Sequence, residues 1–186
     1  MAQPAQATEP AVRVGFGAGI RTTIAAETSR IGASKALVLA TPQQCDAALE
    51  IAELLGPLAV GVFCKAAMHT PVDVTEAAIR HVSEVGADCL IAIGGGSTTG
   101  LCKAIAYRTD LPQITIPTTY AGSEATPILG QTENGIKTTL SDPRALPEVI
   151  LYDAELVRNL PVAMTVTSAL NAMAHAAEAL YATDRT

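Results

Sequence analysis

The stretch Cys89-Leu90-Ile91-Ala92-Ile93-Gly94-Gly95-Gly96-Ser97-Thr98-Thr99-Gly100 decides the fold. It opens on an uninterrupted apolar run, which is typical of a strand buried on both faces. The glycines and hydroxyl residues that follow predict a tight loop before a helix. The same order recurs downstream, where the strand predicted over 113–116 precedes Pro117-Thr118-Thr119-Tyr120-Ala121-Gly122-Ser123-Glu124. Because ligands of parallel sheets bind at the carboxyl ends of strands, the two loops predict one site for a phosphate-bearing ligand.

Strands and helices alternate along the chain on both sides of these stretches. Apolar runs predict the strands, and apolar residues at helical spacing predict the helices between them. Residues 12–19 are expected to form a short strand that enters a glycine turn. The other predicted strands are 35–40, 58–63, 89–93, 113–116, 136–140 and 148–153, and the helices are 20–31, 42–55, 73–85 and 99–107. The pattern predicts a Rossmann-like α/β fold with a mainly parallel sheet covered on both faces.

Two domains are expected. Residues 10–158 form the dinucleotide-binding α/β domain, and residues 159–186 form the first helix of a second, all-helical domain. That helix, predicted over Leu160–Tyr181, is rich in apolar residues and has no following element to pack on. We therefore expect that the chain is a fragment or pairs with another polypeptide, and that in isolation it self-associates or aggregates. Residues 1–10 lack the features of a secretory signal and are expected to form a frayed tail.

Composition excludes several classes of function. The net charge is −6 without any basic run, and aromatic residues make up 3% of the chain, so nucleic-acid binding is not expected. No apolar stretch reaches the ~18 residues of a membrane-spanning helix. The four cysteines show neither CxxC nor zinc spacing, which predicts reduced thiols in a cytoplasmic protein. They are Cys45, Cys64, Cys89 and Cys102.

Taken alone, the motifs leave alternatives open. The loop at 94–100 fits either a pyrophosphate site or a plain strand-to-helix turn, and it is not a Walker A loop. The glycines at 15–19 do not match GxGxxG, and a hairpin-like turn is favoured there. Asp153 is expected to cap a helix, and Lys137 fits either a phosphate contact or a solvated side chain. No Ser-His-Asp or Cys-His triad can be assembled.

One pair of side chains shares a face of the last predicted helix. Asn171 and His175 are spaced i, i+4, and Glu178 follows at i+3 from the histidine. A single histidine beside a neutral amide is a weak basis for a metal site. Spacing alone therefore favours a buried, hydrogen-bonded histidine.

Together these motifs resemble the iron-containing alcohol dehydrogenase superfamily, and within it the maleylacetate reductase branch. The stretches that carry the resemblance are 94–106, 116–128, 137–139 and 170–181. The resemblance implies a nucleotide-binding domain, a helical domain and a cleft between them that binds NADH or NADPH. It places Gly95, Gly96, Ser97 and Thr98 at the pyrophosphate, Thr118, Thr119 and Ser123 beside the nicotinamide, and Lys137 near the ribose and phosphate. It makes His175 and Asn171 the catalytic candidates.

The resemblance also implies an activity, the reduction of maleylacetate to 3-oxoadipate in the degradation of aromatic compounds, and a homodimer at full length. Metal-dependent relatives have Asp at the positions of Asn171 and Gly100, so a metal is not expected to be required. Thr41 stands where many NAD-preferring relatives have an acidic residue, so NADPH is not excluded. Family members continue for about as many residues again, which predicts little turnover by this chain alone. The alternatives are a metal-dependent alcohol or glycerol dehydrogenase and a non-catalytic nucleotide-binding fragment.

Overall fold

The computed structural model describes residues 12–158 and 160–182, so the expected tail at 1–10 lies outside the described residues, as do parts of both predicted domain boundaries. Its centre is a six-stranded sheet of order β1-β8-β5-β4-β2-β3, in which all pairings are parallel. The predicted mainly parallel sheet is therefore confirmed. The strands are β1 (Arg13–Gly17), β2 (Ala36–Leu39), β3 (Ala59–Phe63), β4 (Cys89–Gly94), β5 (Gln113–Pro117) and β8 (Val149–Asp153).

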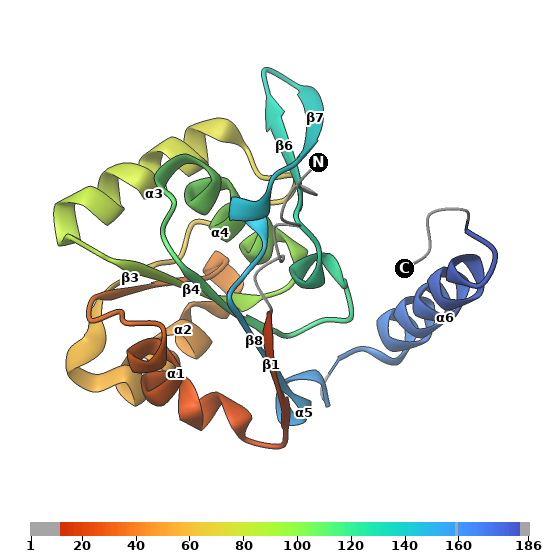
Figure 1. The fold of residues 1–186 in the computed structure, drawn as a ribbon, viewed down its shortest axis with the longest axis horizontal. Coiled ribbons are helices and arrows are strands. Elements are labelled where there is room, and N and C mark those ends of the chain that lie inside the picture. The colour runs from red at the N-terminus through yellow and green to blue at the C-terminus, as the bar shows by residue number, and fades with distance from the viewer. Residues whose placement is uncertain (1–11, 159, 183–186) are drawn as a thin grey trace, which may run out of the picture.

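Helices cover both faces of this sheet (Figure 1). One face packs on α1 (Ile24–Arg30) and α2 (Cys45–Leu55), and the other on α3 (Val72–Val85) and α4 (Gly96–Thr109). Successive residues of β2 point to opposite faces, so Val38 joins the first apolar cluster and Leu37 joins the second. This alternation explains why β2 and β4 are apolar on both faces, since each side chain meets a helix whichever way it points.

The observed turns agree in part with those predicted from the sequence. Gly86 ends α3 with a φ of 64°, a left-handed conformation that favours glycine. The hairpin-like turn predicted at residues 15–19 is wrong. β1 pairs in parallel with β8, and Gly19 leads into a 3-10 helix. Thr41 precedes η2 without a side-chain capping bond. The 3-10 helices are η1 (Ile20–Thr23), η2 (Pro42–Gln44), η3 (Gly56–Leu58), η4 (Ser123–Ala125) and η5 (Pro143–Ala145).

The prediction of four reduced cysteines is wrong. Cys45 and Cys64 form a disulfide, and their Cα atoms lie 5.4 Å apart. The cause is the packing of the fold, because the first residue of α2 lies beside the residue that follows β3. Cys89 and Cys102 are free and buried, and burial raises the pKa of the Cys89 thiol to about 12.

The predicted polar region after β5 contains a hairpin. Its strands are β6 (Ile128–Glu133) and β7 (Ile136–Ser141), of which only the second was predicted. Beyond β8 lie the short α5 (Ala154–Val157) and then α6 (Val162–Ala179), which extends away from the sheet and its covering helices (Figure 1). α6 has no buried residue. Within the described ranges, no helix combines the length and the apolar character needed to span a bilayer.

Candidate functional site

A pocket of about 260 Å³ lies where α4 begins, between the two Gly/Ser/Thr loops. Its lining includes Gly96 and Ser97 from α4, Ser123 from the second loop and Lys137 from β7. Four of the predicted cofactor residues thus meet around one cavity. Serine hydroxyls, a lysine and a helix N-terminus are all suited to an anionic ligand. We call this cavity the anion pocket.

The first loop is shorter than the sequence suggested. Gly95 is the N-cap of α4, so the helix begins at Gly96 rather than at Thr99, and Ser97 and Thr98 lie in its first turn. The Thr98 and Thr99 amides both donate to the Gly95 carbonyl at 3.1 Å, so the amides that precede them in the first turn are the ones suited to an anion. The Thr98 hydroxyl is buried and has no hydrogen-bond partner in the described part of the chain. Gly94 ends β4, and a Cβ there would lie 2.4 Å from that hydroxyl, so the close packing requires glycine.

The second loop is held against the first. The Thr118 amide donates to the Gly94 carbonyl at 3.0 Å, and the Gln44 side chain donates to the Thr118 hydroxyl at 2.8 Å. A Cβ on Gly95 would lie 3.1 Å from the Thr119 side chain, so that glycine lets the loops approach. The structure therefore brings Gly95, Thr118 and Thr119 to the same sheet edge as the anion pocket.

His69 and Thr70 form a wall of the anion pocket that sequence reasoning missed. Both adopt left-handed conformations, with φ values of 65° and 48°, which is uncommon for residues other than glycine. The Thr70 carbonyl accepts from the Thr132 amide of β6, and its side chain fits against Gly100 of α4. We had no role for His69 from the sequence. A left-handed conformation at a residue other than glycine leaves no clear signal in the composition.

Lys103 is a third residue of the anion pocket that sequence reasoning missed. It lies on α4, is 1% exposed and lines the anion pocket. Its ammonium donates to the carbonyl oxygens of Ser123, Thr126 and Ile128. Burial lowers the pKa of Lys103 to about 8, although the neighbouring Glu124 carboxylate acts to raise it. The sequence signal that could have revealed Lys103 is a lysine followed by the apolar residues of the same helix. A cation buried there needs hydrogen-bond acceptors around it.

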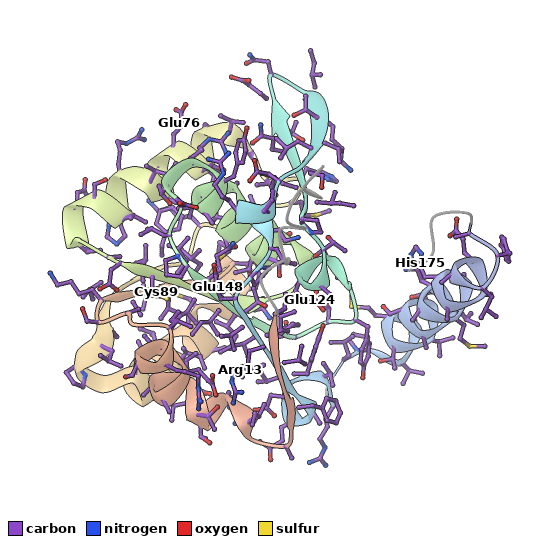
Figure 2. All side chains as sticks on the ribbon, viewed as in Figure 1. Arg13, Glu76, Cys89, Glu124, Glu148 and His175 are labelled. Carbon is purple, nitrogen blue, oxygen red and sulfur yellow. A yellow bond between two sulfur atoms is a disulfide. The ribbon has the colours of Figure 1, made fainter. Side chains whose placement is uncertain are left out.

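A second pocket, of about 500 Å³, lies on the other side of the loop at 118–124. Its lining includes Thr119, Tyr120 and Glu124 from this loop and Tyr152 from β8. The Tyr152 hydroxyl donates to the buried Glu124 carboxylate at 3.1 Å, and burial raises the pKa of Tyr152 to about 12 (Figure 2 locates Glu124). This pocket is mainly apolar in its lining, and the loop at 118–124 contributes residues both to it and to the anion pocket.

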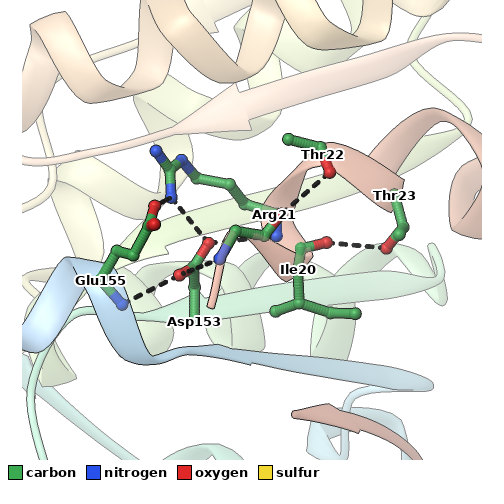
Figure 3. A network of polar contacts seen from close by, with 7 residues as sticks. Ile20, Arg21, Thr22, Thr23, Asp153 and Glu155 are labelled. Atoms are coloured by element: carbon green, nitrogen blue, oxygen red, sulfur yellow. Dashed lines mark hydrogen bonds and ion pairs between the residues drawn. The ribbon is translucent and has the colours of Figure 1, made fainter. Parts of the chain in front are cut away.

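Asp153 has the structural role that the sequence predicted. It caps α5 by accepting from the Glu155 amide at 3.0 Å, and it also accepts from the Gly19 amide and the Arg21 guanidinium (Figure 3). Burial raises the pKa of Asp153, but the hydrogen bonds from Arg21, Gly19 and Glu155 outweigh it, and the net shift is downward. The network fixes the ends of β1 and β8 beside the second pocket.

Asn171 and His175 are not brought to either pocket. Both lie on α6 and are exposed, and the His175 side chain is 71% exposed (Figure 2). The expectation of a buried histidine is therefore wrong, because no described element packs on α6. The His175 imidazole lies 3.9 Å from the Glu178 carboxylate. Across residues 12–158 and 160–182, no three His, Cys, Asp or Glu side chains are grouped as a metal site.

The chain is similar to known proteins of one family. Residues 11–154 match the family model described as iron-containing alcohol dehydrogenase. The maleylacetate reductase of Rhizobium sp. (strain MTP-10005) is 62% identical over 183 residues, covering 98% of this chain and 52% of the relative. The maleylacetate reductase of Burkholderia cepacia is 55% identical over 172 residues, covering 92% of this chain and 49% of the relative. The chain thus spans about half the length of the curated relatives it matches.

Solved structures share the fold. The crystal structure of maleylacetate reductase from Agrobacterium tumefaciens superposes with a TM-score of 0.94 at 60% identity, covering 100% of this chain and 53% of that one. Sulfoacetaldehyde reductase from Bifidobacterium kashiwanohense, solved in complex with NAD+, superposes with a TM-score of 0.86 at 22% identity. That match covers 97% of this chain and 54% of the reductase, and at this identity it shows a similar fold only.

Proposed function

Because the chain belongs to the iron-containing alcohol dehydrogenase family, we propose that it forms the dinucleotide-binding half of a maleylacetate reductase. The reaction is the NAD(P)H-dependent reduction of maleylacetate to 3-oxoadipate. The observation that carries the proposal is the anion pocket at the N-terminus of α4, in a chain 62% identical to a maleylacetate reductase. The chain spans about half the length of such relatives, so the activity of a whole reductase is part of this proposal.

The residues of the anion pocket would hold the dinucleotide. The Gly96 amide and the Ser97 hydroxyl would bind the pyrophosphate, and Lys137, which lines the same pocket, would add a positive charge. Thr118, Thr119 and Ser123 would flank the nicotinamide side. Bound NADH or NADPH supplies the hydride that reduces the carbon–carbon double bond of maleylacetate.

We propose that His175 and Asn171 act on the substrate from α6. An imidazole and an amide are suited to donate hydrogen bonds to the enolate oxygen that develops as the hydride arrives. Both side chains are exposed, which leaves them free for a substrate in the cleft that further helices would complete. The proposed enzyme is a cytoplasmic homodimer.

Iron fits poorly at these positions. The metals of this class prefer several imidazole and carboxylate ligands, whereas α6 offers one imidazole, the neutral amide of Asn171 and one exposed carboxylate, Glu178. We therefore propose that the reaction does not require a metal, and no step is assigned to one.

The test joins this chain to the remaining half of the Rhizobium relative and follows the maleylacetate-dependent oxidation of NADH and NADPH, with and without a chelator. Turnover that resists the chelator is the expected result. Turnover abolished by the chelator would instead indicate a metal-dependent alcohol or glycerol dehydrogenase. Dinucleotide binding without turnover of maleylacetate would indicate a non-catalytic nucleotide-binding protein.

A further inference from the structure

Lys103 is among the largest side chains that are fully buried in this fold. Its ammonium lies 2.5 Å from the Thr126 carbonyl oxygen and 3.0 Å from that of Ile128, and it also donates to the Ser123 carbonyl. An ammonium group has three N–H donors, and here three backbone carbonyls accept them. A buried charge is tolerated only with such partners, so the arrangement depends on all three carbonyls.

These carbonyls belong to one segment, residues 123–128. The segment connects the loop after β5 to β6, and through the hairpin to Lys137 on β7. Its own short-range bonds include those from the Ala125 and Thr126 amides back to Gly122 and Ser123. Such bonds shape the segment internally and do not attach it to α4. Lys103 makes that attachment, because its backbone lies in α4 and its ammonium lies among the carbonyls.

From this placement we propose that Lys103 is a positioning residue, which holds segment 123–128 on α4 and thereby fixes Ser123 and Lys137 across the anion pocket from Ser97. The inference rests on the proposed dinucleotide function of the pocket. In this role the ammonium acts through the backbone of the segment, and it need not touch the ligand.

The positive charge of Lys103 is required for this role. A neutral amine has two N–H donors and leaves one of the three carbonyls unpaired. The charged or titratable groups around the ammonium are Glu124 beside it on the segment, Cys102 next to it on α4, and His69 and Lys137 on the walls of the anion pocket. Burial opposes the charged form and lowers the pKa of Lys103, while Glu124 and Cys102 act to raise it. Segment 123–128 should therefore loosen as the pH rises through about 8.

The test measures hydrogen–deuterium exchange of peptides covering 118–130 in the 186-residue chain, and the affinity for NADH by fluorescence. Lys103→Met should speed exchange in these peptides by roughly tenfold or more and weaken NADH binding by a similar factor. Arg108→Gln removes the same charge from the same helix at an exposed contact with Gln131, and it should change neither readout. Lys137→Met should weaken NADH binding while leaving the exchange unchanged.

The unmodified chain supplies a second measurement, in case Lys103→Met does not fold. Exchange in 118–130, corrected for its intrinsic pH dependence, should rise between pH 7 and pH 9. Unchanged exchange both in Lys103→Met and across this pH range would overturn the proposal, as would weaker NADH binding without faster exchange, which indicates direct contact. If the segment loosens but the unmodified chain binds no NADH, the positioning role stands and the proposed function fails.

Discussion

Replacing Gly100 by alanine should reveal how tightly the left-handed residues at 69–70 pack on α4. A Cβ at this position would lie 2.3 Å from the Thr70 hydroxyl oxygen, well inside any normal contact. That oxygen belongs to a short β-branched side chain that is 4% exposed, on a residue with a φ of 48°. It cannot swing aside as the end of a long side chain would.

The magnitude follows from two opposing terms. Overpacking costs about 1–3 kcal/mol. Exchanging glycine for alanine inside a helix returns about 1 kcal/mol. The net loss of unfolding free energy from Gly100→Ala is therefore about 0–2 kcal/mol. With Thr70→Ala already present the clash disappears, because the remaining Cβ would lie 3.6 Å away. In that background Gly100→Ala should stabilise by up to about 1 kcal/mol.

The assay is a double-mutant cycle by urea denaturation of the original chain, the two single variants and the double variant. The expected coupling between the two positions is about 1–3 kcal/mol, with a change of sign for Gly100→Ala between the backgrounds. The same cost in both backgrounds, or a coupling below about 0.5 kcal/mol, would refute the packing argument.

Other features of the structure lead to four more predictions. Cys45→Ser opens a disulfide whose cysteines are 19 residues apart, and it should cost about 3 kcal/mol in unfolding experiments without reductant; a reductant should remove this difference. Asp153→Asn should cost about 1–3 kcal/mol at neutral pH. Because the net folded pKa of Asp153 is lowered, this stabilisation is present above the ordinary aspartate pKa of about 3.9 and disappears as the pH falls through the folded value, which pH-dependent denaturation would detect. Thr41→Asp should shift coenzyme preference toward NADH by about tenfold or more, measured as the ratio of the two dissociation constants. The exposed apolar side chains of α6 should make the isolated chain self-associate, and a monomer at high concentration in sedimentation would contradict this.

The fold was predictable because its signals are local. The run at 89–93 is apolar throughout, as expected for a strand in the middle of a covered sheet, whereas the run at 113–116 also buries Gln113 and Thr115. Gly86 was readable as the end of a helix because the left-handed turn excludes most other residues. The Gly/Ser/Thr loops were readable as a site because the ends of parallel strands share one edge.

The remainder depends on contacts between distant residues. Cys45 and Cys64 show no motif, and only the packing of α2 beside β3 makes them neighbours. Lys103 looked like one more charge on a helix, and its partners are backbone carbonyls, which every sequence has. β6 was missed because its face is only half covered and its residues do not form an apolar run.

The sheet places the first strand of the fold beside its last, since β1 pairs with β8 and Arg13 lies opposite Val149. On the ribosome β1 leaves the exit tunnel long before its partner exists. At about 5–20 residues per second the strand waits on the order of ten seconds for β8, with its backbone donors and acceptors on that side unpaired. The strands β2, β3, β4 and β5 can pair with one another during this interval. Moving β1 to a position after β8 by circular permutation should therefore shorten the period in which this strand has no partner.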